Sequence, residues 1–204
     1  MLIEKAMAMG ARDARLIPVG TIPVEHEIQQ MCKSPRCIGY GQCANCPPYV
    51  TSQDESRIWI ARFNEALIVK MDIPPKLLTS ENHYDPFKRI FLIVTSLERI
   101  ALKQGYQNAS ALGAGSCKPV FCMDQPCAVL QGKECRYPHL ARPSLEAIGI
   151  NVFKLAQRVG WKMYKILKGT DSNTVPSASL IGMVLLSLPS QMMLKPETNK
   201  DNRG

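Results

Sequence analysis

The sequence predicts an α/β fold, a layered domain with a roughly four-stranded sheet flanked by helices and with cysteine-rich loops at the element ends. Short apolar runs rich in β-branched residues alternate along the chain with longer segments whose apolar residues recur at helical spacing. A chain of 204 residues, 46% apolar and 21% charged, has the composition of a globular domain with one core. We expect a single domain over residues 1–190, followed by a polar flexible tail at 191–204.

The first half of the chain is expected to contribute two helices and two strands. Ser52 and Glu55 form a capping box, which marks the start of a helix. Prolines interrupt the apolar stretch 14–24, so it suits at most an edge strand. The expected elements are a short helix at 2–9, an edge strand within 14–24, a loop at 32–50, a helix from 53 to about 63, and a buried strand at 66–73.

The second half is expected to alternate strands with two further helices. Asp85 can cap a helix whose first residue is Pro86, and Gly105 ends it after a broad apolar face. Asn151 caps a second helix that Gly160 stops. The expected elements are a helix at 86–104, a strand at 108–113, a helix at 152–159 and a buried strand at 178–188.

Charge and apolar content narrow the class of protein. The net charge is +8, but Lys and Arg are scattered without a basic stripe, which makes nucleic-acid binding an unfavoured interpretation. Glu4 and Lys5 interrupt the N-terminal segment, so we expect no secretion signal. The longest apolar run, 178–188, is shorter than the about 20 residues of a membrane span, so we expect none. We therefore expect a cytoplasmic protein, whose thiols stay reduced and form no disulfides.

All eight cysteines fall into two groups of four. They lie among Pro, Gly, Lys and Gln, whereas structural thiols of a core occur in periodic apolar segments. This setting favours metal ligands. The first group is Cys32, Cys37, Cys43 and Cys46, and the second is Cys117, Cys122, Cys127 and Cys135.

The spacing of these cysteines favours an iron–sulfur cluster and leaves zinc as the alternative. Cys43 and Cys46 fit the short spacing with which a turn presents two thiolates to a tetrahedral zinc ion. The other gaps are wider, which suits a larger cluster whose ligands bind separate irons. One or two [4Fe–4S] clusters are expected. His139, four residues after Cys135, is a further candidate ligand.

Two glycine-containing turns adjoin the cysteines, Gly39-Tyr40-Gly41 and Gly113-Ala114-Gly115. Glycine lets the backbone approach a cluster closely, and backbone amides there can donate hydrogen bonds to cluster sulfurs. The segment from Arg142 to Glu146 has two interpretations. Pro143 can start a helix with Glu146 in its first turn, or Arg142 and Glu146 can flank the cluster and tune it.

Taken together, these motifs resemble the DUF2284 family of predicted metal-binding proteins, which occurs in anaerobic bacteria and methanogenic archaea. The first motif reads Cys32-x4-Cys37-x2-Tyr40-Gly41-x4-Cys46-Pro47-Pro48. The second half matches through Gly105-Tyr106, Ala111-Leu-Gly-Ala-Gly115, the second cysteine group with Cys135-Arg136-x-Pro138, and Arg142 to Val152. The resemblance covers roughly residues 5–190. It implies a cysteine-bound metal centre, an iron–sulfur one, in the cytoplasm of an anaerobe. The two glycine turns, for their part, lead us to expect Tyr40, Gly41 and Gly115 beside the cofactor.

The resemblance carries seven of the cysteines, because Cys43 stands where a small non-ligand residue is expected. Three hypotheses follow. The first is an iron–sulfur protein that transfers electrons to a redox partner with an acidic surface, suited to the basic chain. The second is an enzyme or activase with a site-differentiated cluster, if Cys43 is no ligand and one iron stays open. The third is a zinc-binding scaffold or nucleic-acid-binding protein.

Overall fold

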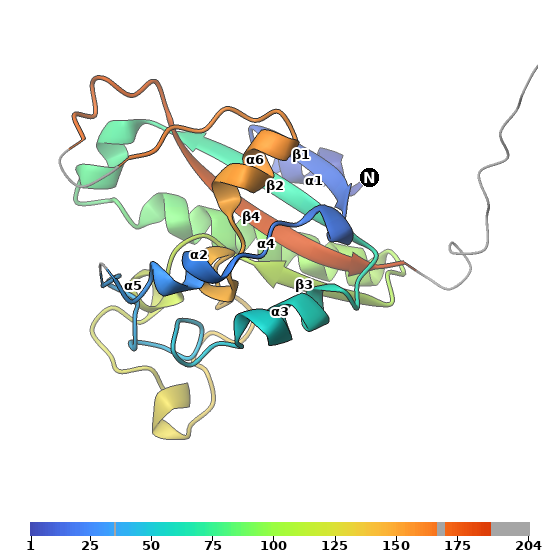
Figure 1. The fold of residues 1–204 in the computed structure, drawn as a ribbon, viewed down its shortest axis with the longest axis horizontal. Helices are drawn as coiled ribbons and strands as arrows, with labels where there is room; N and C mark the ends of the chain where they lie inside the picture. The colour runs from blue at the N-terminus through green and yellow to red at the C-terminus, as the bar shows by residue number, and fades with distance from the viewer. Residues whose placement is uncertain (35, 167–169, 189–204) are drawn as a thin grey trace, which may run out of the picture.

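The computed structural model describes residues 1–34, 36–166 and 170–188 (Figure 1). These residues form a four-stranded antiparallel sheet with helices on both faces, so the expected α/β class and the strand number are confirmed. The strand order is β1-β2-β4-β3. The strands are β1 (Asp13–Pro18), β2 (Glu65–Ile73), β3 (Asn108–Leu112) and β4 (Ala178–Ser187).

The sheet is built around the two most apolar strands. β2 and β4 pair along their whole length, from Glu65 opposite Leu186 to Ile73 opposite Ala178. β1 lies at one edge, as its prolines predicted, and β3 lies at the other. Residues that alternate along β2 face opposite sides of the sheet, as the two-residue period of a strand requires.

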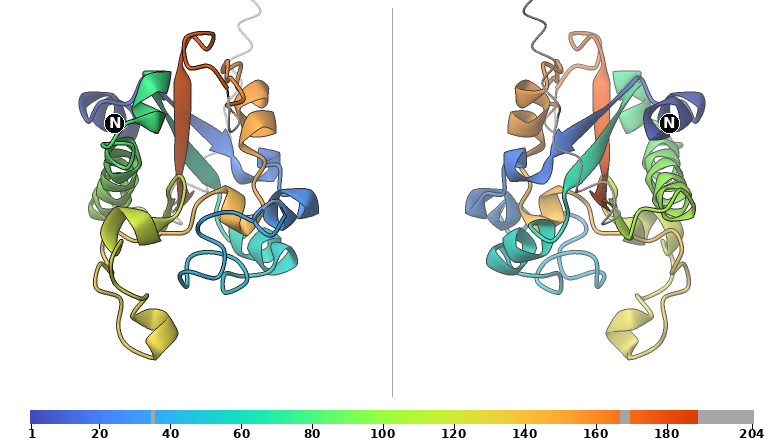
Figure 2. Two further views of the ribbon diagram at one scale, coloured as in Figure 1. Left: turned by 90° about the vertical axis from the view of Figure 1, so that its left-hand side faces the viewer. Right: turned by 90° about the vertical axis from the view of Figure 1, so that its right-hand side faces the viewer.

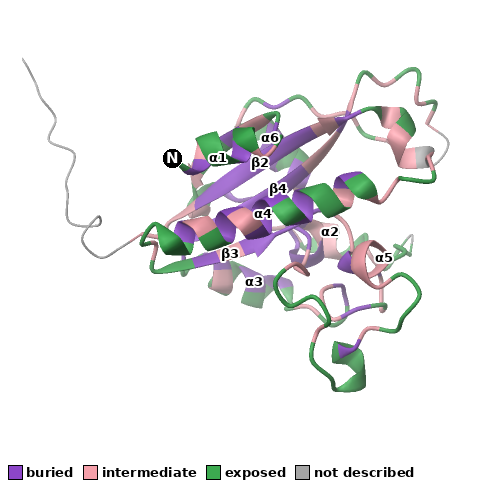
Figure 3. Ribbon diagram, turned by 180° about the vertical axis from the view of Figure 1, so that it is seen from behind, coloured by how far each residue is buried: buried purple, intermediate pink, exposed green. Residues whose placement is uncertain are grey.

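Each face of the sheet buries its own hydrophobic cluster. Helices α1 (Leu2–Ala8) and α4 (Asp85–Lys103) cover one face, where Leu67 and Val69 of β2 meet Ile90 and Leu97 of α4. Helices α3 (Gln53–Ile60) and α6 (Val152–Arg158) lie on the other face with the 3-10 helix η4 (Glu146–Ile148). Figure 2 shows these three layers edge-on, and Figure 3 shows the buried strands between them.

The helix starts follow the predicted caps closely. Ser52 and Glu55 form the expected capping box at α3, and the Asn151 side chain accepts a hydrogen bond from the amide of Lys154 at α6. α4 differs by one residue, because Tyr84 takes the cap position and Asp85 lies in the first turn. A carboxylate in the first turn still complements the helix dipole.

Two local predictions were incomplete or wrong. α2 (His26–Gln30) was not predicted, and its five largely polar residues carry no apolar period that would indicate a helix. Pro143 does not start a helix. Ser144 instead forms a bridge to Gly113, and the helical turn begins only at Glu146.

Further short elements are α5 (Cys117–Phe121), η1 (Val19–Thr21), η2 (Pro75–Thr79) and η3 (Val129–Gln131). The predicted tail at 191–204 lies outside the described residues.

No helix among the described residues is long and apolar enough to cross a membrane.

Candidate metal centre

The two cysteine-rich loops lie on the same side of the layered body. The first joins α2 to α3, and the second follows β3 and contains α5. Figure 2 shows both loops beyond the sheet, with the segment 122–135 (yellow) extending from the body. Between them the structure contains two cavities. We call these cavity A and cavity B.

Cavity A has a volume of about 290 Å³ and is lined by Cys32, Cys37 and Cys46 of the first group. Glu146 of η4 faces the same space. The remaining wall comes from several elements and is mainly apolar. It includes Phe87, Val152, Met163 and Leu180.

Cavity B has a volume of about 310 Å³ and is lined by all four cysteines of the second group. Cys43 lines it as well, although the sequence places this residue in the first group. The cysteines therefore divide in space as three and five. Cys43 and Cys46 are joined by a backbone turn, yet they line different cavities.

Four contacting residues, Cys43, Cys46, Ser116 and Cys117, form a shared wall between the cavities. The Ser116 hydroxyl oxygen lies 3.3 Å from the Cys46 sulfur and 3.7 Å from the Cys43 sulfur. The Cys117 sulfur lies 3.9 Å from the Cys43 sulfur. The three cysteines are buried and pack with Phe91. Two centres in these cavities would be separated by a single layer of side chains.

Nitrogen donors point at several of the sulfurs. The backbone amide of Gly39 lies 3.5 Å from the Cys37 sulfur, and that of Tyr137 lies 3.4 Å from the Cys135 sulfur. The Asn45 side-chain amide lies 3.5 Å from the Cys117 sulfur. Such bonds stabilise anionic sulfur. A Cβ atom on Gly39 would approach Ser116 to 2.8 Å, so glycine is required for the close fit of the loop.

The thiols of the shared wall perturb one another. The pKa of Cys43 is lowered because the thiols of Cys117 and Cys46 donate hydrogen bonds to its sulfur. The pKa values of Cys46 and Cys117 are raised, since each holds its proton against the Cys43 thiolate and is buried. Ionising all three together requires a nearby positive charge, which a metal supplies.

Cys32 and Glu146 show the effect of burial in cavity A. Burial, reinforced by the charges of Cys37 and Glu146, raises the pKa of Cys32 to about 11. Burial also raises the pKa of Glu146, against the opposing hydrogen bonds from its own amide and from the Ser144 hydroxyl. Glu146 retains accessible surface because its side chain faces the cavity.

The donor set fits a metal bound through sulfur. All eight cysteines are described and none forms a disulfide. Among the described residues, no three His, Cys, Asp or Glu side chains converge on a point where one ion would sit. The thiols are instead distributed around two hollow spaces.

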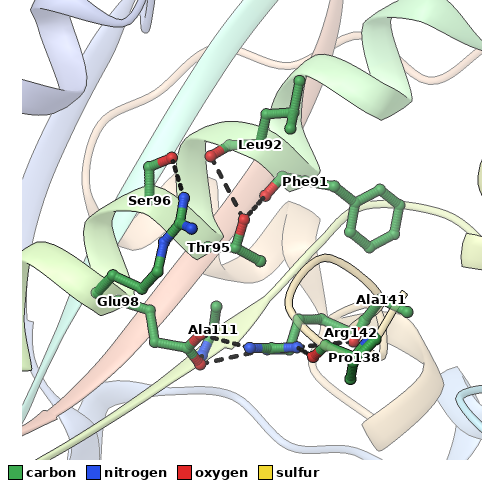
Figure 4. Close-up of polar contacts among 10 residues, drawn as sticks. Phe91, Leu92, Thr95, Ser96, Glu98, Ala111, Pro138, Ala141 and Arg142 are labelled. Carbon is green, nitrogen blue, oxygen red and sulfur yellow. Dashed lines mark hydrogen bonds and ion pairs between the residues drawn. The ribbon is translucent and has the colours of Figure 1, made fainter. Parts of the chain in front are cut away.

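An ion pair attaches the second cysteine loop to α4 (Figure 4). The Arg142 guanidinium lies 2.6 Å from the carboxylate of Glu98, and both side chains are largely buried. Arg142 also donates hydrogen bonds to the carbonyl oxygens of Pro138 and Ala141, shortly after Cys135. Arg142 therefore positions the loop through Glu98, whereas Glu146 reaches cavity A.

The other predicted site residues lie close to the cavities with two exceptions. Tyr40 and Gly115 line cavity A. Gly41 does not line either cavity; its amide donates to the Pro47 carbonyl oxygen at 2.8 Å and so shapes the loop. His139 is exposed and does not line cavity B. Sequence reasoning missed Ser116 and Asn45, whose only signal was their position next to cysteines.

An α/β body that presents thiols to two adjacent cavities has the form of a cysteine-rich metal-binding protein. A comparison with known protein families identifies the family to which the chain belongs. The DUF2284 family, described as predicted metal-binding protein, matches residues 15–186, and the chain belongs to this family. The family predicted from the cysteine motifs is thereby confirmed. No curated protein and no solved structure was found to match the chain significantly.

Proposed function

We propose that this protein is a cytoplasmic iron–sulfur protein that carries two adjacent clusters and transfers electrons to a protein partner in anaerobic metabolism. In this proposal Cys117, Cys122, Cys127 and Cys135 hold a [4Fe–4S] cluster in cavity B, and Cys32, Cys37 and Cys46 hold a second in cavity A. The observation that carries the proposal is the arrangement of all eight thiols around two cavities with a shared wall.

The form of the cavities favours a cluster over zinc. A structural zinc ion needs four ligands that converge on one point at about 2.3 Å for sulfur. The cysteines here line spaces of about 290 and 310 Å³ without such convergence among the described residues. The irons of a cluster are separate, so their thiolates can approach from different sides.

The exposed segment that lines cavity B suits electron exchange with a partner protein. Residues 122–137 are mostly exposed or half-buried (Figure 3), so a protein can dock close to this centre. The net charge of +8 would steer an acidic partner towards the chain. Electrons would then cross the shared wall between the two clusters.

The position of Cys43 favours a second candidate function, an enzyme or activase with a site-differentiated cluster. Cys43 lines cavity B, so cavity A offers three thiolates to four irons. The fourth iron would face the apolar part of cavity A, where a small molecule can be activated.

Metal analysis of anaerobically purified protein tests both functions. We expect brown protein with about eight irons and matching sulfide per chain, four for each cluster. A colourless chain with stoichiometric zinc would overturn the iron–sulfur proposal.

Cysteine replacements then distinguish a closed cluster in cavity A from an open one. Cys43→Ser should leave the iron content unchanged, whereas Cys127→Ser should remove about half of it. If Cys43→Ser also removed half of the iron, Cys43 would be a ligand, and the double variant Cys43→Ser, Cys127→Ser would show of which cluster. Loss of all the iron from the double variant would place Cys43 on the cluster in cavity A and exclude a site-differentiated cluster, whereas loss of only half would place it on the cluster in cavity B.

A further inference from the structure

We infer that Glu146 is the fourth protein ligand of the cluster in cavity A, through a carboxylate oxygen on the iron that lacks a thiolate. The inference rests on the proposed function, because it requires a cluster held by Cys32, Cys37 and Cys46. It adds a ligand that the cysteine pattern does not contain.

The position of Glu146 is fixed relative to the first cysteine loop. Its turn, η4, packs against α2, which directly precedes Cys32. The Gln29 side chain of α2 donates hydrogen bonds to the carbonyl oxygens of Ala147 at 2.9 Å and Thr51 at 3.0 Å. One side chain thus connects the residue after Glu146 to both ends of the cysteine loop.

The side chain of Glu146 shares cavity A with the three thiols. It lines the same space as Cys32, Cys37 and Cys46. Among the described residues that line cavity A, Glu146 is the acidic one. The Ser116 hydroxyl is bonded to the Cys46 thiol, and that of Ser144 accepts from the Ala147 amide, so neither is placed to replace it.

The lack of an ion-pair partner gives a further reason for a cation beside Glu146, which is half-buried. A carboxylate partly removed from water is stabilised by a nearby cation. The buried glutamate of α4, Glu98, has such a partner in Arg142 at 2.6 Å. None of the ion pairs formed by the described residues includes Glu146. The cluster with its three thiolates would be anionic as a whole, but the iron that lacks a thiolate would be a cation within bonding distance of the carboxylate.

Carboxylate ligation predicts an iron that leaves and returns readily. On oxidation by ferricyanide a [4Fe–4S]²⁺ cluster gives up one electron, releases Fe²⁺ and leaves [3Fe–4S]⁺. Dithionite returns the electron when Fe²⁺ binds again. A carboxylate oxygen binds Fe²⁺ less strongly than a thiolate does, so this iron should be lost before those held by cysteine.

The experiment compares Glu146→Gln, Glu146→Cys and the wild-type holoprotein. Each is treated with ferricyanide, and the three-iron cluster is measured by electron paramagnetic resonance. Fe²⁺ is then titrated back with dithionite. Glu27→Gln, an exposed glutamate of α2, is the matched control.

Loss of a residue that only hydrogen-bonds to a metal ligand lowers metal affinity about 10- to 100-fold. Glu146→Gln removes a direct ligand, so it should weaken the rebinding of Fe²⁺ by at least that factor. Glu146→Cys should suppress formation of the three-iron cluster, because all four irons then have thiolates. Glu27→Gln should behave as wild type. If Glu146→Gln fails to fold, the protection given by Glu146→Cys still supports the inference.

Two results overturn the inference, and they are distinguishable. Equal conversion and rebinding in wild type, Glu146→Gln and Glu146→Cys would exclude Glu146 as ligand while leaving the two-cluster protein intact. A wild-type chain that lacks iron and sulfide would overturn the proposed function itself, and the inference with it.

Discussion

Replacement of Arg142 by alanine should destabilise the protein strongly, because it leaves the buried carboxylate of Glu98 without its cation. The guanidinium contacts both carboxylate oxygens, at 2.6 and 3.3 Å. The side chains of Arg142 and Glu98 are 21% and 11% exposed. Breaking a buried pair from one side costs about 3–5 kcal/mol. Since Arg142 keeps a fifth of its surface, we expect about 3 kcal/mol.

Chemical denaturation of the anaerobic protein measures the loss in the free energy of unfolding directly. In thermal unfolding, about 3 kcal/mol corresponds to a fall in Tm of about 6–12 °C for a chain of this size. Arg99→Ala, an exposed arginine of α4 next to Glu98, should cost no more than about 0.5 kcal/mol. The double variant Glu98→Gln, Arg142→Met removes both charges and keeps an acceptor for the Ala111 amide. It should be more stable than Arg142→Ala.

A loss below about 1 kcal/mol for Arg142→Ala is the range of an exposed ion pair and would show that burial adds nothing to this one. A double variant no more stable than Arg142→Ala would show that the unpaired Glu98 carboxylate is not the cause of the loss. A second readout is the metal centre proposed for cavity B. Arg142 holds the carbonyl oxygens that follow Cys135, so Arg142→Ala should also release metal from that cavity faster.

Three further predictions concern the metal-free thiols, the packing near the cavities and the metal itself. In the apoprotein, the rate at which iodoacetamide alkylates Cys32 should rise with pH, with a midpoint near pH 11 rather than 9. Glu146→Gln removes a nearby negative charge and should lower that midpoint. Because the unfolded chain releases this proton first, the apoprotein should lose stability as pH rises from 9 to 11; a flat stability profile would contradict the shift. Gly113→Ala should cost about 1–3 kcal/mol in thermal unfolding, because its Cβ would lie 2.3 Å from the Phe91 ring, whereas Gly20→Ala meets no atom within 4 Å and should be much milder. Chelation of the metal under reducing conditions should expose both cysteine loops to proteolysis and leave the far-ultraviolet circular dichroism almost unchanged; cooperative loss of the sheet would show that the core depends on the metal.

Local sequence signals predicted most of the sheet and helices for identifiable reasons. The capping box of Ser52 and Glu55 and the β-branched run of β2 act over a few residues, so they are visible in the chain. The short helix α2 and the extended backbone at Pro143 depend on partners far away in sequence. Ser144, for example, pairs with Gly113. Such contacts leave no local pattern.

The candidate site was predictable as a set of residues, but its partition between two cavities was not. The Cys43-x2-Cys46 spacing suggested two thiols on one side of a metal, whereas the two side chains line different cavities. The spacing of two cysteines predicts a turn, but the direction of each side chain depends on the residues that pack against it. Here Ser116 and Cys117, about 70 residues later in the chain, contact Cys43 and Cys46 and determine the direction of their side chains.

The strand order has a consequence for how the protein is made. β4 is the last strand among the residues that the structure describes, yet it lies between β2 and β3 and provides the pairing for β3. During synthesis the sheet therefore cannot close until β4 has left the ribosome. Both cysteine loops emerge earlier, before the scaffold that brings them together exists. Metal insertion should accordingly wait for β4 to pair, and the nascent thiols need a reducing environment until then.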